Sequence, residues 1–252
     1  MIYGLYQSAA GMMTNEYRQN VLANNVANAE TIGFKRDVPV FAERIPADLA
    51  GLREGPSAES LAAMTGGIWL GRTETDFSAG GLVSTENPLD VALDGPGFLA
   101  VQVGDEVQFT RDGRFTTTPN GQLVAISDGA PILGVGGTPL MLDPRAGLDH
   151  VQIDEDGRIF QDERYVGQFQ LADFDNYSTL RKVGAQRFTA PDNTAVAAPA
   201  LVRNGYLETS GADALPELVD MIEASRAYQI NAQMVTLQDQ TASRLISTVL
   251  RA

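Results

Sequence analysis

The two ends of this chain share a helical pattern, and a long middle segment of β-type sequence separates them. Apolar side chains recur at helical or heptad spacing at both ends: Leu5, Ala9 and Met12 near the start, and Met221, Tyr228, Val235, Ala242 and Val249 near the end. An amphipathic helix cannot bury its apolar stripe alone. The pattern therefore predicts that the terminal helices pack on each other or on copies from neighbouring chains.

Charge is distributed unevenly along the 252 residues. Residues 1–36 carry a net +1 and residues 213–252 a net −2, so −13 of the total −14 lies in the middle. Like charges keep a solvent-facing surface soluble, whereas near-neutral ends can associate. With only two lysines, Lys35 and Lys182, the chain lacks the clustered cations needed for non-specific binding to nucleic acid or to an anionic membrane.

The composition leaves few kinds of chemistry open. The chain has no cysteine, and His150 is its only histidine, so we expect no disulfide, thiolate chemistry or His-based metal centre. Asp154 and Asp156 resemble the start of a calcium loop, but the later ligands of that pattern are missing. We therefore expect no catalytic residue, metal, cofactor or small-molecule substrate, and no enzyme activity.

We also expect neither a cleaved leader nor insertion in a membrane. Polar residues interrupt the N-terminus from Gln7 onward, where a leader would be apolar. No stretch approaches the roughly 20 apolar residues that span a bilayer.

The N-terminal pattern predicts one helix over residues 1–30. Asparagine competes for backbone hydrogen bonds and tolerates left-handed geometry. The cluster of Asn24, Asn25 and Asn28 therefore favours termination of the helix at this point.

A short motif follows the asparagine cluster. Gly33 is expected to supply a turn, and Phe34 to act as an apolar anchor. Lys35 and Arg36 lie where cations interact favourably with the negative end of the helix dipole. The motif is compatible with a plain helix terminus and with a partner-specific role.

A second helix is predicted from residue 213 to residue 250. Asp213 suits the N-cap, Pro216 suits the first turn, and Glu217 adds an acid near the positive end of the dipole. A helix far beyond the average of about 11 residues is normally stabilised by a coiled coil or a bundle. Polar heptad positions weaken an isolated dimer, so we expect many copies to share the seam; these positions include Ser225, Asn231, Gln238 and Asp239.

The segment between the helices reads as a connector followed by β-structure. Frequent Pro and Gly over residues 37–80 predict an irregular connector, in which residues 57–64 suit a short helix. Three Asx-Gly pairs in the region after it predict β-hairpins: Asp112–Gly113, Asn120–Gly121 and Asp156–Gly157. No helical run alternates with the strands, so an antiparallel sandwich or small barrel is favoured over βαβ units.

The predicted fold class is therefore α+β. The N-terminal helix of residues 1–36 and the C-terminal helix of residues 213–252 would pair as a coiled-coil-like helical domain. Residues 37–80 connect this domain to a central all-β antiparallel domain of residues 81–212.

Three blocks of sequence stand out in order along the chain. The first is Ala-Asn-Asn-Val-Ala-Asn at 23–28 with Gly-Phe-Lys-Arg at 33–36; the second is Asn-Pro-Leu-Asp-Val-Ala at 87–92 with Phe-Thr-Arg-Asp-Gly-Arg-Phe at 109–115; the third is Gly-Tyr-Leu-Glu-Thr-Ser at 205–210 with Arg-Ala-Tyr-Gln-Ile-Asn at 226–231. They closely resemble the N-terminal, central and C-terminal signatures of flagellar basal-body rod, hook and hook-associated axial proteins. In one departure, Gly211 stands where the family pattern has Asn.

The resemblance implies a structural subunit of the bacterial flagellar rod. Terminal helices of such subunits form the wall of a helical tube that transmits torque and encloses the export channel, with the β region outside. It implies copies of the chain and other rod proteins as partners, export through the flagellar type III apparatus, and a place in the basal body where the rod crosses the periplasm. The assembly interface is then expected at Leu5, Ala9, Met12, Ala23, Asn24, Asn25, Ala27, Asn28, Met221, Arg226, Tyr228, Val235, Ala242, Leu245 and Val249, with a family-motif turn at Gly33, Phe34, Lys35 and Arg36.

Two alternatives remain at this point. Within the family, the chain length and the segment 131–139 most resemble the proximal-rod type, and the distal-rod or hook type is the runner-up. Outside the family, the β region would serve as a carbohydrate-binding or adhesin module and the helices as an oligomerisation tag.

Overall fold

The computed structural model describes residues 2–43, 67–147, 150–190 and 195–249. The chain divides into two compact units. The helical unit contains residues 1–27, 37–74 and 213–252, and the β unit contains residues 28–36 and 75–212. No helix in the described ranges has both the length and the apolar character needed to cross a bilayer.

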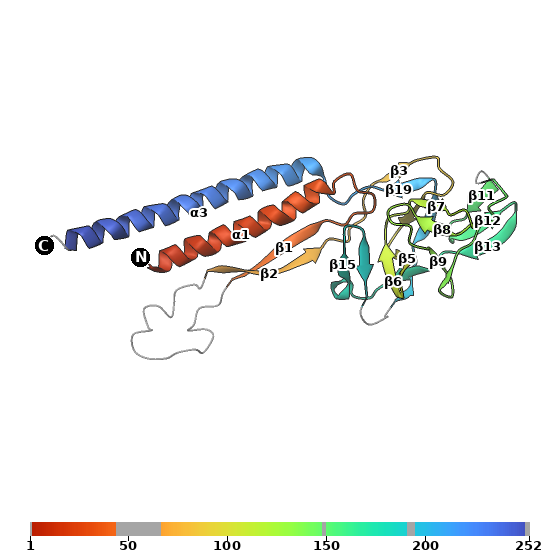
Figure 1. Cartoon of the computed structure of the whole chain (residues 1–252), viewed down its shortest axis with the longest axis horizontal. Coiled ribbons are helices and arrows are strands. Elements are labelled where there is room, and N and C mark those ends of the chain that lie inside the picture. The colour runs from red at the N-terminus through yellow and green to blue at the C-terminus, as the bar shows by residue number, and fades with distance from the viewer. Residues whose placement is uncertain (1, 44–66, 148–149, 191–194, 250–252) are drawn as a thin grey trace. The chain divides into compact units, whose positions relative to one another are not determined.

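Two long helices, α1 (Ile2–Ala27) and α3 (Ala214–Val249), pack against each other in the helical unit. They run antiparallel, so that the start of α1 lies beside the later part of α3 (Figure 1). The helix α1 ends at Ala27, three residues earlier than predicted. The predicted N-cap of α3 is confirmed, because Asp213 Oδ1 accepts a hydrogen bond from the Leu215 amide at 3.2 Å.

The seam between the helices includes small and polar residues. A Cβ on Gly4 would lie 2.9 Å from Gln238 Nε2, and one on Gly11 would lie 3.0 Å from Asn231 Nδ2. Further along, Arg18 Nη2 lies 3.5 Å from Asp220 Oδ1. Gly4 and Gly11 therefore allow α3 to approach closely, and the polar heptad residues Asn231 and Gln238 lie against them.

The predicted connector contains a strand pair. Strand β1 (Asp37–Glu43) and strand β2 (Ile68–Thr75) form a two-stranded sheet, and β1 contacts α1. A Cβ on Gly71 would lie 2.9 Å from the Val40 carbonyl oxygen, so this glycine permits the close pairing of the strands. The prediction of an irregular segment was thus wrong over residues 37–43. The short helix predicted over residues 57–64 lies outside the described residues.

The β unit consists of short strands, and every strand pair with a defined register in it is antiparallel. Its largest sheet has the order β15-β16-β6-β5-β14-β17, and the remaining strands form sheets of two or three. The strands are β3 (Leu82–Ser84), β4 (Val91–Asp94), β5 (Phe98–Val103), β6 (Glu106–Thr110), β7 (Phe115–Thr117), β8 (Leu123–Ala125), β9 (Leu133–Gly134), β10 (Thr138–Pro139), β11 (Val151–Ile153), β12 (Arg158–Gln161), β13 (Arg164–Gln168), β14 (Leu171–Asp173), β15 (Arg181–Val183), β16 (Arg187–Thr189), β17 (Val196–Ala197), β18 (Leu201–Asn204) and β19 (Tyr206–Glu208), with a 3₁₀ turn η3 (Tyr177–Thr179).

Two of the three predicted hairpins are confirmed. Gly157 turns between β11 and β12, and Gly121 turns between β7 and β8; both glycines have a positive φ. The third was wrong, because β6 and β7, on either side of Gly113, belong to different sheets. A Cβ on Gly113 would lie 1.6 Å from the Val91 carbonyl oxygen. This glycine is therefore required for close approach to β4 and not for a hairpin turn.

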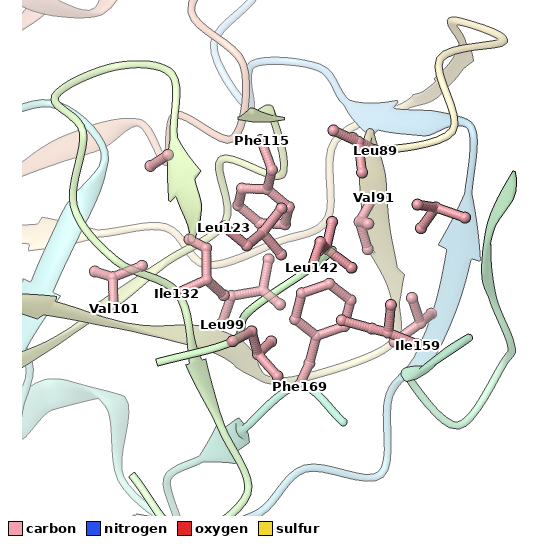
Figure 2. Close-up of a cluster of buried hydrophobic side chains, with 14 of the residues drawn as sticks. Leu89, Val91, Leu99, Val101, Phe115, Leu123, Ile132, Leu142, Ile159 and Phe169 are labelled. Atoms are coloured by element: carbon pink, nitrogen blue, oxygen red, sulfur yellow. The ribbon is translucent and has the colours of Figure 1, made fainter. Parts of the chain in front are cut away.

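Two hydrophobic clusters form the core of the β unit. The larger joins strands from several of its sheets, and Figure 2 shows Phe115, Leu99 and Phe169 pointing into one interior. The smaller is aromatic and includes Phe98 and Phe188. The core thus takes residues from across the β unit, as expected for non-local antiparallel pairing.

A candidate assembly surface and the motif turn

The face of α3 that points away from α1 carries a row of exposed apolar side chains. We call it the outer stripe: Leu215, Val219, Ile222, Ile230, Met234 and Leu237. Its members follow one another at intervals of three, four or eight residues, which places them on one side of a helix. Between 45% and 71% of each of these residues is exposed. Exposed apolar rows of this extent mark interaction surfaces.

The predicted interface residues of α3 divide between its two faces. Met221, Tyr228, Val235 and Ala242 are partly buried and share a helical face with Asn231 and Gln238, the residues that lie against α1. Arg226 is exposed and lies at the spacing of the outer stripe, four residues from both Ile222 and Ile230. Leu245 is also exposed but lies seven residues after Gln238, on the side of the helix that faces α1 further along. Val249 is the last residue of α3, and its side chain lies outside the described residues.

The predicted interface residues of α1 also differ in their surroundings. Leu5, Ala9 and Met12 are partly buried, and Leu5 and Met12 each directly follow a glycine of the seam. The exposed ones lie in the last two turns of the helix and are Ala23, Asn24 and Ala27. Asn28, which follows α1, is half-buried.

Asn25 alone among the predicted asparagines is fully buried. Its amide nitrogen donates to the Asp37 carbonyl oxygen at 2.9 Å and to Glu217 Oε2 at 3.1 Å. The Asp37 amide donates back to Asn25 Oδ1 at 3.0 Å. One side chain therefore connects the end of α1, the start of β1 and the first turn of α3. Its role in this chain is to organise the helical unit from within.

The motif turn at residues 33–36 lies in the β unit and is largely buried. Gly33 has a φ of +68°, and its amide donates to the Glu208 carbonyl oxygen at 2.8 Å. Phe34 is 1% exposed, and Lys182 Nζ lies 4.0 Å from the centre of its ring. The turn is therefore an internal part of the β unit.

Lys35 forms a buried ion pair, and not the contact with the helix dipole that the sequence predicted. Its Nζ lies 2.6 Å from Glu208 Oε1 and donates to the Ser78 carbonyl oxygen at 2.8 Å. Arg111 approaches the other oxygen of Glu208 at 3.0 Å. The expected contact was wrong because α1 ends at Ala27, well before Lys35.

The buried charges are unequal, since one carboxylate faces two cations. The three side chains are 1%, 4% and 1% exposed for Lys35, Arg111 and Glu208. Burial lowers the pKa of Lys35; the charge of Glu208 opposes this shift, and the charge of Arg111 adds to it. Arg111 is also held by the Gly95 carbonyl oxygen at 2.7 Å and by the face of Phe98.

Sequence reasoning did not assign Arg111 and Glu208 to any site. Both lie inside the signature blocks, Arg111 in 109–115 and Glu208 in 205–210. A charged residue inside an otherwise strand-like block was the available signal. Charge alone does not reveal its partner, which lies 97 residues away in the sequence for this pair.

Comparison with known families covers the same three regions. Residues 5–35 match the model described as flagella basal body rod protein. Residues 92–161 match the flagellar hook protein FlgE/F/G D1 domain, and residues 203–248 match the flagellar basal body rod FlgEFG protein C-terminal region.

Full-length relatives agree with these matches. FlgG of Buchnera aphidicola subsp. Baizongia pistaciae is 35% identical, with 97% of this chain and 99% of the relative covered. FlgF of Caulobacter vibrioides is 36% identical, with 98% of this chain and 96% of the relative covered, and FlgG of the same organism is 30% identical, with 94% and 95% covered. The chain belongs to the flagellar basal-body rod protein family of FlgF and FlgG. This is a family of structural components of the rod in the flagellar basal body, and not an enzyme family.

Proposed function

We propose that this chain assembles helically with copies of itself and with other rod proteins into the drive shaft that transmits torque and encloses the export channel. The observation that carries the proposal is the outer stripe of α3. It is apolar and exposed in the single chain, while the opposite face of the same helix is already occupied by α1. The family assignment supports rod subunits as its partners and favours this function over the carbohydrate-binding alternative.

The proposed geometry is one in which each subunit contacts neighbours through different surfaces. An interface of this kind that does not close on itself generates a helical filament. In this proposal, residues 213–252 and the N-terminal helix form the wall as a coiled-coil-like pair, and residues 81–212 lie outside it. The concentration of negative charge in the middle of the sequence supports an outward, solvated position for the β region.

The residues of the proposed interface fall into two groups with different contacts. Residues on the α1-facing side of α3, such as Met221 and Val235, hold the helix pair together. Residues of the outer stripe, with Arg226 and Leu245, contact the neighbouring subunit. Export by the flagellar type III apparatus would deliver the chain to the periplasmic section of the basal body.

We further propose that the chain is of the proximal-rod, FlgF type. The two Caulobacter vibrioides relatives provide a comparison within one organism, and the FlgF protein has the higher identity, 36% against 30%. The alignment with Buchnera FlgG spans 264 positions, more than the 252 residues of this chain, whereas that with Caulobacter FlgF spans 250. Expression in strains lacking either rod protein tests this: rescue of swimming only in the strain without FlgG would overturn it.

The assembly proposal is tested by placing a charge on the outer stripe. Ile230→Asp is expected to leave the folded chain intact, because the side chain is 60% exposed, and to abolish incorporation into basal bodies, because burying an unpaired carboxylate at an interface is costly. Incorporation is measured by immunoblotting of purified basal bodies. Thr236→Asp is the charge-matched control, since Thr236 is exposed but lies off the stripe. Normal incorporation of Ile230→Asp would contradict the proposal.

A further inference from the structure

The chain passes between the helical unit and the β unit four times, after residues 27, 36, 74 and 212. On the β-unit side, the residues next to these passages form three crossing segments: 28–36, 75–81 and 205–212. The crossing segments are far apart in sequence. Within the β unit they are nevertheless bonded to one another.

Backbone hydrogen bonds connect the crossing segments in pairs. They run from the Gly33 amide to the Glu208 carbonyl oxygen at 2.8 Å, from the Gly211 amide to the Phe34 carbonyl oxygen at 2.8 Å, and from the Asp76 amide to the Arg36 carbonyl oxygen at 2.9 Å. The segment 28–36 is therefore bonded to both of the others. A side-chain pair repeats one of these connections, because Arg36 Nε lies 3.1 Å from Asp76 Oδ2.

The Glu208 carboxylate is the point at which all three crossing segments meet. Its Oε1 accepts from Lys35 Nζ at 2.6 Å, from segment 28–36, and from the Gly80 amide at 2.9 Å, from segment 75–81. Glu208 itself belongs to segment 205–212. Its Oε2 accepts from Arg111 at 3.0 Å, which fixes the group to the interior of the β unit.

We propose that Glu208, Lys35 and Arg111 form a clamp that holds the crossing segments together as one piece. Pulling segment 28–36 or segment 205–212 away would leave a buried charge without its partner, which is strongly unfavourable. Pulling segment 75–81 away would remove the Gly80 amide from Glu208 and the Ser78 carbonyl oxygen from Lys35, so both buried charges would lose a hydrogen bond. The segments therefore open together or not at all. A load on α1 or α3 then enters the β unit through every passage of the chain at once. This role rests on the proposed function, because only a subunit of a rotating rod carries such a load.

The clamp is tested in the full-length chain with Lys35→Met. This change removes the ammonium group but leaves Arg111 and Glu208 as a balanced pair, so the β unit is expected to fold. Amide hydrogen exchange is then measured at four amides: Gly33 in segment 28–36, Asp76 and Gly80 in segment 75–81, and Gly211 in segment 205–212. We expect the exchange rates of the four amides to rise at least tenfold over the wild type, each by the same factor. The exchange rates of the β5 amides should not change.

Arg203→Met is the matched control, because Arg203 forms exposed ion pairs with Asp94 and Glu155 in the same unit. This substitution should change the exchange rate of none of the four amides by more than twofold. Glu208→Gln provides a second variant, in which the amide nitrogen that replaces one oxygen cannot accept from Arg111 or Lys35. It should open the same four amides. Unchanged exchange in both variants, or opening of one segment alone, would overturn the clamp.

The role under load is read from swimming. Cells whose only copy carries Lys35→Met are expected to build rods and to swim in dilute medium, but to lose speed at least twofold relative to the Arg203→Met strain in viscous medium. Equal speeds of the two strains would overturn the role under load. Absence of the wild-type chain from purified basal bodies is a different result, which would refute the proposed function itself.

Discussion

Single glycines determine where segments of the β unit can approach each other. Gly33 has a φ of +68°, and a Cβ there would lie 2.5 Å from the Arg111 carbonyl carbon. Gly104 has a similar φ of +61°, but no neighbouring atom lies within 4 Å of the position that its Cβ would take. The two positions therefore share the same backbone strain and differ in available space.

We expect Gly33→Ala to destabilise the chain by about 3 kcal/mol or more, and Gly104→Ala by about 1 kcal/mol. The difference between the two losses of stability measures the overlap of the added Cβ with the backbone of Arg111. Urea unfolding followed by far-ultraviolet circular dichroism measures both. Equal losses in the two variants would show that the enclosure of Gly33 contributes nothing.

Tyr177 gives the β unit a dependence on alkaline pH. Burial and a hydrogen bond from its hydroxyl to Asp173 Oδ1 at 2.6 Å raise the pKa of Tyr177 to about 12. In the unfolded chain the pKa of tyrosine is about 10. Between these values the unfolded chain has lost its proton and the folded chain has kept it, so the stabilisation present below pH 10 is lost as the pH rises toward 12.

The corresponding test compares the wild-type chain with Tyr177→Phe. The variant lacks this titration, so its free energy of unfolding should be lower at pH 8 and should converge on that of the wild type as the pH approaches 12. Denaturant unfolding at several pH values gives both curves. Parallel curves over this range would refute the assignment.

At the scale of elements, two opposite faces of α3 have different environments. One side contacts α1 through Asn231 and Gln238, and the other carries the outer stripe. In the sequence, both faces of α3 are visible as apolar residues at helical spacing. The sequence does not show which of the two stripes is covered within the chain, because that depends on the position of α1.

Val235→Asp therefore tests the inner face as Ile230→Asp tests the outer one. Val235 is partly buried on the side facing α1, and a carboxylate there should destabilise the helix pair by roughly 2 kcal/mol. We expect faster amide exchange throughout α1 and no change in the core strands β4 and β5. The same exchange pattern in Ile230→Asp, or no change in α1 for Val235→Asp, would contradict this division of faces.

The elements themselves were predictable where their signal is local. The hairpin turns at Gly121 and Gly157 and the cap at Asp213 depend on nearby residues, and the structure confirms them. The Asp112–Gly113 pair carries the same local signal as the two true hairpins. Its outcome was decided by β4, which is distant in sequence and needs the space that a side chain on Gly113 would fill.

At the scale of the whole molecule, the sequence by itself determined the α+β plan, the two long terminal helices and the membership of the rod family. Periodicity, capping and turn residues act over a few positions, so they can be read along the chain. The signature blocks added the family, and with it a structural role in the basal body.

Tertiary structure alone decided what the motif residues do. Lys35 follows a helix in the sequence, and the local rule predicted a contact with the helix dipole. Folding instead brings it to Glu208, 173 residues away, with Arg111 on the other side of the same carboxylate. A buried charge is tolerated only beside its partner, and the partner is chosen by the path of the whole chain, which no local pattern contains.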